Sequence, residues 1–186
     1  MNDFFRKSIL YVFRKLNLSN LLNKMKAYFY FKNASLSFGN NIKIAGFSTK
    51  VNIGNNCSFY KNCIFEFSEN STLIIGNNFV LSYGVIISCN KSIKIGDDVQ
   101  IGEYTSIRDT THDYSDLGVP IKYNADISKE ISIGNNVWIG RGCIILPGTI
   151  IEDGVVVGAN SIIKGHLKKD NIYAGSPIKH IKNRLK

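Results

Sequence analysis

A six-residue repeat of large aliphatic side chains most constrains how this 186-residue chain can fold. The longest unbroken run comprises Ile133, Ile139, Ile145, Ile151, Val157 and Ile163. The fifth residue of each hexad in this run is small or β-branched. A period of six matches neither an α-helix, which repeats about every 3.6 residues, nor plain strand alternation. It is typical of short strands joined by tight corners, with one large side chain pointing inward per hexad.

Three such hexads complete one triangular coil of about 18 residues. Ile133 is then expected to lie under Ile151, and Ile139 under Val157, about 4.8 Å apart. One coil alone buries almost no apolar surface, but stacked coils form a continuous aliphatic core. We predict a solenoid of about six coils.

The phase of the repeat slips upstream. Ile53, Ile75, Ile95 and Ile133 carry the same phase, yet each interval between them exceeds one coil, and the last interval has the largest excess. This excess predicts that residues 109–130 leave the repeat as a projecting loop. Loops that project from rigid scaffolds are where function concentrates.

Composition excludes several classes of protein. A hydrophobic content of 44% rules out a disordered chain. Cys57, Cys63, Cys89 and Cys143 form no CxxC pair and no zinc-ligand spacing, so we expect packing residues and no metal. We see no apolar run long enough to span a bilayer and no signal peptide, which favours a cytoplasmic protein.

Positive charge is concentrated in residues 1–32. That segment holds seven basic residues against Asp3 alone, or +6 of the net charge of +9, which argues against a nucleic-acid-binding face. Its apolar residues follow helical spacing, so we predict a basic amphipathic helical segment. This segment either docks against the trimer that the chain is expected to form or rests on the anionic inner face of the membrane. Residues 33–168 are assigned to the repeat domain and 169–186 to a closing segment.

The sequence IGNNVWIGRGCIILPGTIIEDGVVVGANSIIKG (133–165) resembles the C-terminal coils of hexapeptide-repeat acyltransferases. The similarity is to the maltose/galactoside O-acetyltransferase branch, including capsule and lipopolysaccharide acetyltransferases. YAGSPIKHIK (173–182) resembles the closing segment there, and TTHDYSD (110–116) stands where that branch has its catalytic histidine. The resemblance implies an all-β, left-handed parallel β-helix, a homotrimer with active sites between subunits, and acetyl-CoA as co-substrate.

His112 is the candidate general base, because it alone of the three histidines lies in the predicted loop. An alcohol is a poor nucleophile at pH 7, and histidine has an ordinary pKa near 6.5 that suits proton abstraction. Asp109 or Asp113 is a candidate to orient the ring, although either could instead cap or turn the loop. His166 and His180 are expected to be structural or surface residues.

By the resemblance, the acceptor-binding positions are Ser68, Ser82 and Asn90, and hydrogen bonding within corners is the alternative. Ser82 stands where the branch usually has Asn. Either Ser82 or a backbone N–H could stabilise the oxyanion. The positions implied for the coenzyme are Trp138, Arg141, Ala159, Lys164, Gly165, Lys179 and Lys182. Solvated surface charge is the alternative for the lysines, and corner packing for Trp138.

The function predicted is transfer of acetyl from acetyl-CoA to a sugar hydroxyl in surface polysaccharide biosynthesis. Three alternatives stay open: an amine of a nucleotide-linked amino sugar, an antibiotic hydroxyl, and a non-catalytic solenoid scaffold. A scaffold would bind no acyl donor. The related carbonic anhydrase fold needs three histidines that converge at a subunit boundary. Two of the three histidines of this chain lie in its last 21 residues, so we do not expect that activity.

Overall fold

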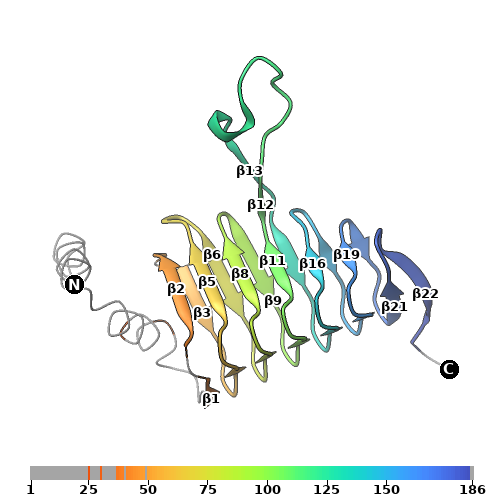
Figure 1. Cartoon of the computed structure of the whole chain (residues 1–186). Helices are drawn as coiled ribbons and strands as arrows, with labels where there is room; N and C mark the ends of the chain where they lie inside the picture. Colours follow the sequence, from red (N-terminus) through yellow and green to blue (C-terminus); the bar gives the residue numbers. More distant parts are fainter. Residues whose placement is uncertain (1–24, 26–29, 31–36, 40, 49, 185–186) are drawn as a thin grey trace.

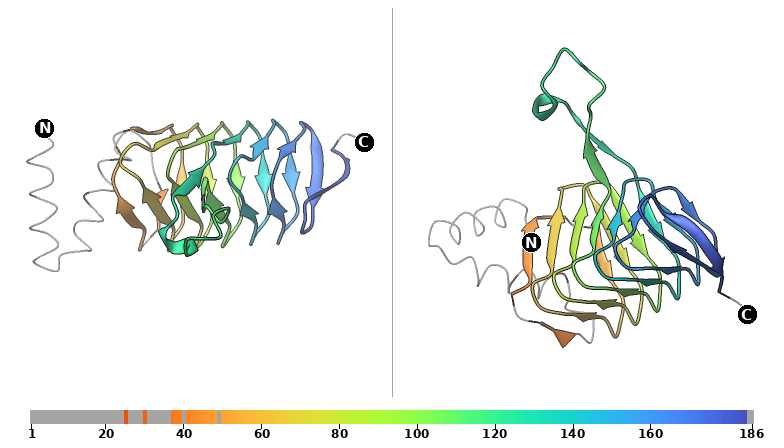
Figure 2. Two further views of the ribbon diagram at one scale, coloured as in Figure 1. Left: turned by 90° about the horizontal axis from the view of Figure 1, so that it is seen from above. Right: turned by 45° about the vertical axis from the view of Figure 1, so that its right-hand side comes forward.

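The computed structural model describes residues 25, 30, 37–39, 41–48 and 50–184. Within these residues the chain winds into a parallel β-helix whose coils stack along one axis (Figures 1 and 2). Each coil contributes one strand to each of three sheets, which form the faces of a prism. The fold confirms the predicted solenoid of about six coils.

The three faces are built from short strands. Face 1 consists of β1 (Ser37–Phe38), β4 (Ser58–Phe59), β7 (Val80–Leu81), β10 (Gln100–Ile101), β15 (Trp138–Ile139), β18 (Val156–Val157), β21 (Asn171–Ala174) and β22 (Lys179–Asn183). Face 2 consists of β2 (Lys43–Gly46), β5 (Ile64–Phe67), β8 (Ile86–Cys89), β11 (Ser106–Arg108), β16 (Ile144–Ile145) and β19 (Ile162–Ile163). Face 3 consists of β3 (Lys50–Ile53), β6 (Thr72–Ile75), β9 (Ser92–Ile95), β14 (Ile131–Ile133), β17 (Ile150–Ile151) and β20 (His166–Leu167). All pairs within the faces are parallel except β21 with β22, where the chain folds back over the edge of the last coil.

The register agrees with the spacing of the repeat. Ile133 pairs with Ile151, and Ile139 pairs with Val157, as predicted. Ile53, Ile75, Ile95 and Ile133 are successive partners on face 3, so each irregular interval still amounts to one coil. The inward aliphatic residues form one buried core.

The extra residues all enter at the corner between faces 2 and 3. In a regular coil, six residues separate the inward Ile145 from Ile151, whereas Ile107 and Ile133 are separated by 26. The longest insertion forms an arm, in which β12 (Thr110–His112) pairs antiparallel with β13 (Asp126–Ser128) and a 3-10 helix η1 (Ile121–Tyr123) lies between them. The arm projects well beyond the prism in Figure 1, and the predicted projecting loop is confirmed.

The predicted segment 1–32 lies outside the described residues, apart from Met25 and Tyr30, whose backbone is helical. Tyr30 is buried against the first two coils, with its ring centroid 5.3 Å from that of Phe67 in β5. Its hydroxyl accepts a hydrogen bond from the Ser48 N–H at 3.0 Å. Tyr30 at least is therefore docked. No helix among the described residues is long and apolar enough to cross a membrane.

Candidate active site

A cleft of about 510 Å³ opens at the corner between faces 2 and 3, at the root of the arm. Its floor is an outward row of face 2 in which Ala45, Glu66, Ser88 and Arg108 are successive partners. Arg108 Nη2 lies 3.1 Å from Glu66 Oε2 across this floor. The corner turns and the arm complete the lining with Gly46, Phe67, Ser68, Asn90, Thr110, Thr111, His112 and Asp126.

His112 ends β12 and lies opposite Asp126 of β13 in the register of the arm. The ring Nδ1 is 2.8 Å from Asp126 Oδ1, and the histidine side chain is 67% exposed. A carboxylate at Nδ1 favours the tautomer that carries its proton there. Nε2 is then left as an acceptor on a side chain that lines the cleft, which is the arrangement a general base requires.

Asp126, and neither Asp109 nor Asp113, orients His112. The Asp109 carboxylate is buried and accepts hydrogen bonds from the backbone N–H groups of Asn90, Lys91 and Ser92. Asp113 closes a local turn by accepting from the Ser115 N–H at 2.9 Å, which lowers its carboxyl pKa. The alternative of turning the loop therefore applies to Asp113, whereas Asp109 binds the corner of the preceding coil. Sequence reasoning missed Asp126 because only the cross-strand register of the arm brings it to His112.

Ser68 and Asn90 both line the cleft with His112, as the prediction for the acceptor site requires. Ser68 begins the turn after β5, and its hydroxyl donates a hydrogen bond to Asn90 Oδ1 from the corner of the next coil. Ser71 closes the same turn by donating from its N–H to the Ser68 carbonyl at 3.0 Å. Hydroxyl and amide groups that face an open cleft are suited to hydrogen bonding with a sugar.

Ser82 does not reach this cleft. It lies at the corner between faces 1 and 2, where its N–H donates to the Ile101 carbonyl at 3.0 Å. The full length of β8, about 13 Å at 3.3 Å per residue, separates that corner from Asn90. A single chain therefore splits the predicted acceptor positions between two corners, because Ser82 precedes β8 and Asn90 follows it.

The positions implied for the coenzyme divide in the same way. Arg141 and Ala159 lie at the corner between faces 1 and 2 in successive coils, and the Arg141 carbonyl accepts from the Asn160 N–H at 2.8 Å. Lys164 and Gly165 lie at the corner between faces 2 and 3, and Gly165 has a φ of 98°.

The other three coenzyme positions belong to face 1. Trp138 is 54% exposed on its outer surface, beside Gln100 and Val156 in register. Lys179 and Lys182 are exposed on β22. The described chain thus brings the seven coenzyme positions together only as a band around its last three coils.

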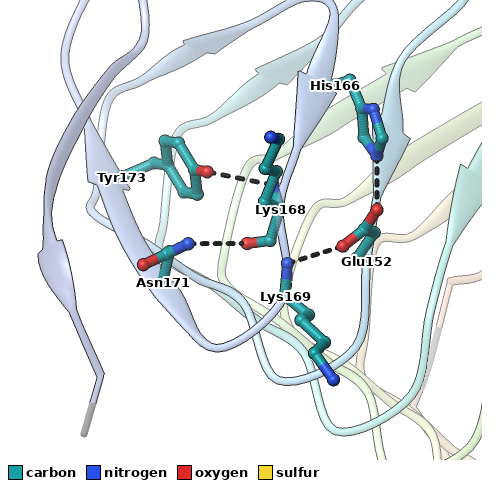
Figure 3. Close-up of polar contacts among 6 residues, drawn as sticks. All are labelled: Glu152, His166, Lys168, Lys169, Asn171 and Tyr173. Carbon is teal, nitrogen blue, oxygen red and sulfur yellow. Dashed lines mark hydrogen bonds and ion pairs between the residues drawn. The ribbon is translucent and has the colours of Figure 1, made fainter.

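His166 and His180 lie away from the arm, as expected. In Figure 3, His166 Nε2 points at Glu152 Oε1, 2.7 Å away, while Glu152 Oε2 accepts from the Lys169 N–H at 2.8 Å. The Lys169 N–H, followed by the His166 hydrogen bond, holds the pKa of the Glu152 carboxyl below its ordinary value. These contacts tie the last full coil together, and neither His166 nor His180 lines the cleft at the root of the arm.

The four cysteines are buried free thiols. Burial raises the pKa of each thiol, and that of Cys89 reaches about 12 because the Asp109 carboxylate adds to the effect. A thiol with such a pKa stays protonated at neutral pH and is a poor nucleophile. The cysteines are packing residues, and within the described residues no three metal-ligating side chains gather.

The hexapeptide solenoid defines the class of this protein, and the comparisons agree. Residues 130–165 match the family model of the bacterial transferase hexapeptide (six repeats). A putative lipopolysaccharide biosynthesis O-acetyl transferase of Escherichia coli is 34% identical over 139 residues, covering 71% of this chain and 71% of that protein. The chain belongs to the hexapeptide-repeat transferase family, and its fold class is the left-handed parallel β-helix.

One further sequence relative and one solved structure are also similar to this chain. A probable acetyltransferase of Mycobacterium tuberculosis is 32% identical over 117 residues, but the chain spans only 39% of its length. The solved structure of AntD, an N-acyltransferase from Bacillus cereus in complex with dTDP and 3-hydroxybutyryl-CoA, is similar with a TM-score of 0.69 and 25% identity. That match covers 81% of each chain.

Proposed function

We propose that the protein transfers an acetyl group from acetyl-CoA to a sugar hydroxyl, with His112 as the general base. The observation that carries the proposal is the His112–Asp126 pair, 2.8 Å apart, at a cleft lined by Ser68 and Asn90. The acceptor belongs to a surface polysaccharide or its precursor. The lipopolysaccharide O-acetyl transferase relative supports this acceptor class.

In the proposed reaction, the acceptor hydroxyl donates its hydrogen bond to His112 Nε2. As its oxygen attacks the thioester carbonyl, the proton passes to Nε2, and Asp126 stabilises the imidazolium that forms. Ser82 or a backbone N–H stabilises the tetrahedral oxyanion. Collapse of the intermediate breaks the carbon–sulfur bond, and the leaving thiolate recovers the proton from His112.

The site is completed in a homotrimer. Face 2 separates Ser82, Arg141 and Ala159 from the cleft of their own chain, so we assign these residues to the cleft of a neighbouring subunit. Lys164 and Gly165 lie at the same corner as the cleft, two coils along the axis. Between the two corners, the outward Ile144 and Ile162 are 43% and 36% exposed and offer an apolar track for the pantetheine arm. Lys179 and Lys182 would pair with the phosphates of the coenzyme.

Transfer to the amine of a nucleotide-linked amino sugar is the second candidate. The likeness to AntD, an N-acyltransferase solved with dTDP and an acyl-CoA, favours it. An amine acceptor is protonated near pH 7 and would also need a base, so His112 suits both reactions. The two candidates differ in the acceptor alone.

A thiol-release assay with acetyl-CoA separates the candidates. The panel contains methyl β-galactoside, methyl α-glucoside, maltose and a dTDP-linked amino sugar, and water serves as the blank. Release with the neutral sugars supports O-acetylation, whereas release with the amino sugar alone would establish the second candidate. Calorimetry with acetyl-CoA checks the scaffold alternative, for which no heat of binding is expected.

We further propose that residues 1–32 give reversible affinity for anionic membranes, on the strength of their net charge of +6. Co-sedimentation with anionic vesicles should fall steeply as salt rises. Binding by a 1–32 deletion that equals binding by the full chain would contradict this proposal.

A further inference from the structure

Asp109 is the only acidic or basic side chain that is fully buried among the described residues, with an exposed fraction of 0%. It stands between Arg108 on the floor of the cleft and Thr110 at the start of the arm. A carboxylate is costly to bury unless its oxygens are hydrogen-bonded. The groups that hydrogen-bond to the Asp109 carboxylate therefore show which parts of the fold this residue holds together.

The carboxylate oxygens accept three consecutive backbone N–H groups from the corner of the preceding coil. Oδ1 lies 2.7 Å from the Asn90 nitrogen, and Oδ2 lies 2.8 Å from the nitrogens of both Lys91 and Ser92. The Asp109 carbonyl accepts from the Lys129 N–H at 2.8 Å, which joins the two ends of the arm at its root. One residue thus connects the corner that bears Asn90 to the arm that bears His112.

The departure of the arm explains why a carboxylate is needed at this point. One coil earlier, the N–H groups of Ser68 and Thr72 donate to the carbonyls of Cys89 and Lys91 in the next coil. At Asn90–Ser92, where the next coil inserts the arm between β11 and β14, the three N–H groups donate instead to the carboxylate of Asp109. The side chain of Asp109 takes the place of backbone carbonyls as the acceptor.

We propose that Asp109 is a positioning residue for the acetyl transfer, acting through Asn90 and His112 without touching the substrate. The inference rests on the proposed function, because it assumes that the acceptor binds at Asn90 and reacts at His112. With the carboxylate in place, the acceptor-binding corner and the base keep one fixed separation. An error of about 1 Å in such a separation can lower a rate about 10²-fold.

The test is the isosteric substitution Asp109→Asn, which replaces one acceptor oxygen with an NH₂ donor that faces backbone N–H groups. The matched control is Asp116→Asn, since Asp116 lies on the same arm and accepts a single N–H, from Gly118 at 2.8 Å. The assay measures kcat, KM for the panel sugar with the fastest thiol release, and the Kd of acetyl-CoA. Asp109→Asn should lower kcat about 10²-fold and raise KM for the sugar, with the Kd of acetyl-CoA unchanged and the control unaffected.

A kcat within twofold of the unmodified enzyme would overturn the proposal. Parallel losses of turnover and acetyl-CoA binding would also overturn it, because they indicate a general structural role.

Amide hydrogen exchange supplies a readout that needs neither an acceptor nor a folded variant. In the unmodified protein, the amides of residues 90–92 should exchange as slowly as those of β8. Exchange as fast as at the tip of the arm would show that the carboxylate does not hold the corner, and would overturn the proposal even if every sugar in the panel proves inert.

Discussion

The coils from β14 to β20 and the coils that flank the arm follow the same repeat, but they differ at one corner. In the later coils the six-residue spacing is unbroken from Ile133 to Ile163, its inward residues pack in one core, and backbone groups at its corners join the coils through hydrogen bonds. In the earlier coils the chain adds residues between faces 2 and 3, and there Ser68, Asn90 and His112 come together. The difference teaches that the regular repeat supplies a rigid core, while departures from it bring together the candidate base and the candidate acceptor-binding groups.

The largest effect on stability is expected from the regular coils. Ile145 is fully buried in the aliphatic column, so Ile145→Ala should lower the free energy of unfolding by about 2–5 kcal/mol. Guanidinium unfolding at fixed protein concentration measures the loss. The control Ile150→Ala truncates a half-exposed outward residue and should cost about 1 kcal/mol or less. A lower kcat of the folded Ile145→Ala protein would contradict the comparison, in which the core residues of the regular coils serve stability and the arm serves catalysis.

A smaller effect, on catalysis alone, is expected at the arm. Asp126→Ala removes the carboxylate that fixes the tautomer and orientation of His112, so kcat should fall about tenfold, part of the 10²–10⁴ that a positioned base contributes. Thermal stability and the Kd of acetyl-CoA should stay unchanged, as should both quantities in Asp116→Asn. A stability loss without a kcat loss would reduce Asp126 to a structural role.

The smallest effect is expected at Glu152, in the last regular coil. Its pKa is below the ordinary value of 4.5, so the ionised carboxylate stabilises the folded state above that pH. This contribution is lost as the pH falls through the lowered pKa. Glu152→Gln should therefore lower Tm slightly at pH 7, and the difference should vanish under acid conditions. Glu69→Gln, at an exposed residue of a corner turn, serves as the control. A difference that grows toward low pH would contradict the assignment.

Much of the fold could be predicted because the repeat directly encodes the register. The intervals from Ile53 to Ile151 fixed which residues stack, and the excess after Ile107 predicted the arm. The partners of the arm could not be predicted, since Asp126 reaches His112 only through antiparallel pairing inside the insertion.

The corners of the prism limited the prediction of the site in another way. Ser68 and Asn90 share the cleft because both follow strands of face 2, whereas Ser82 precedes one. Spacing alone does not reveal that a whole face separates these corners. The burial of Asp109 was equally hidden, because it depends on three backbone N–H groups from a corner about 18 residues earlier in the chain, which donate to its carboxylate.

The most direct test of the account is turnover by His112→Ala, measured by thiol release alongside calorimetric binding of acetyl-CoA. The account predicts that kcat falls about 10²–10⁴-fold while acetyl-CoA binds nearly as before, because the base is removed and the coils that form the proposed coenzyme track are untouched. Full turnover by His112→Ala would contradict the account, because the chemistry would then not depend on the arm.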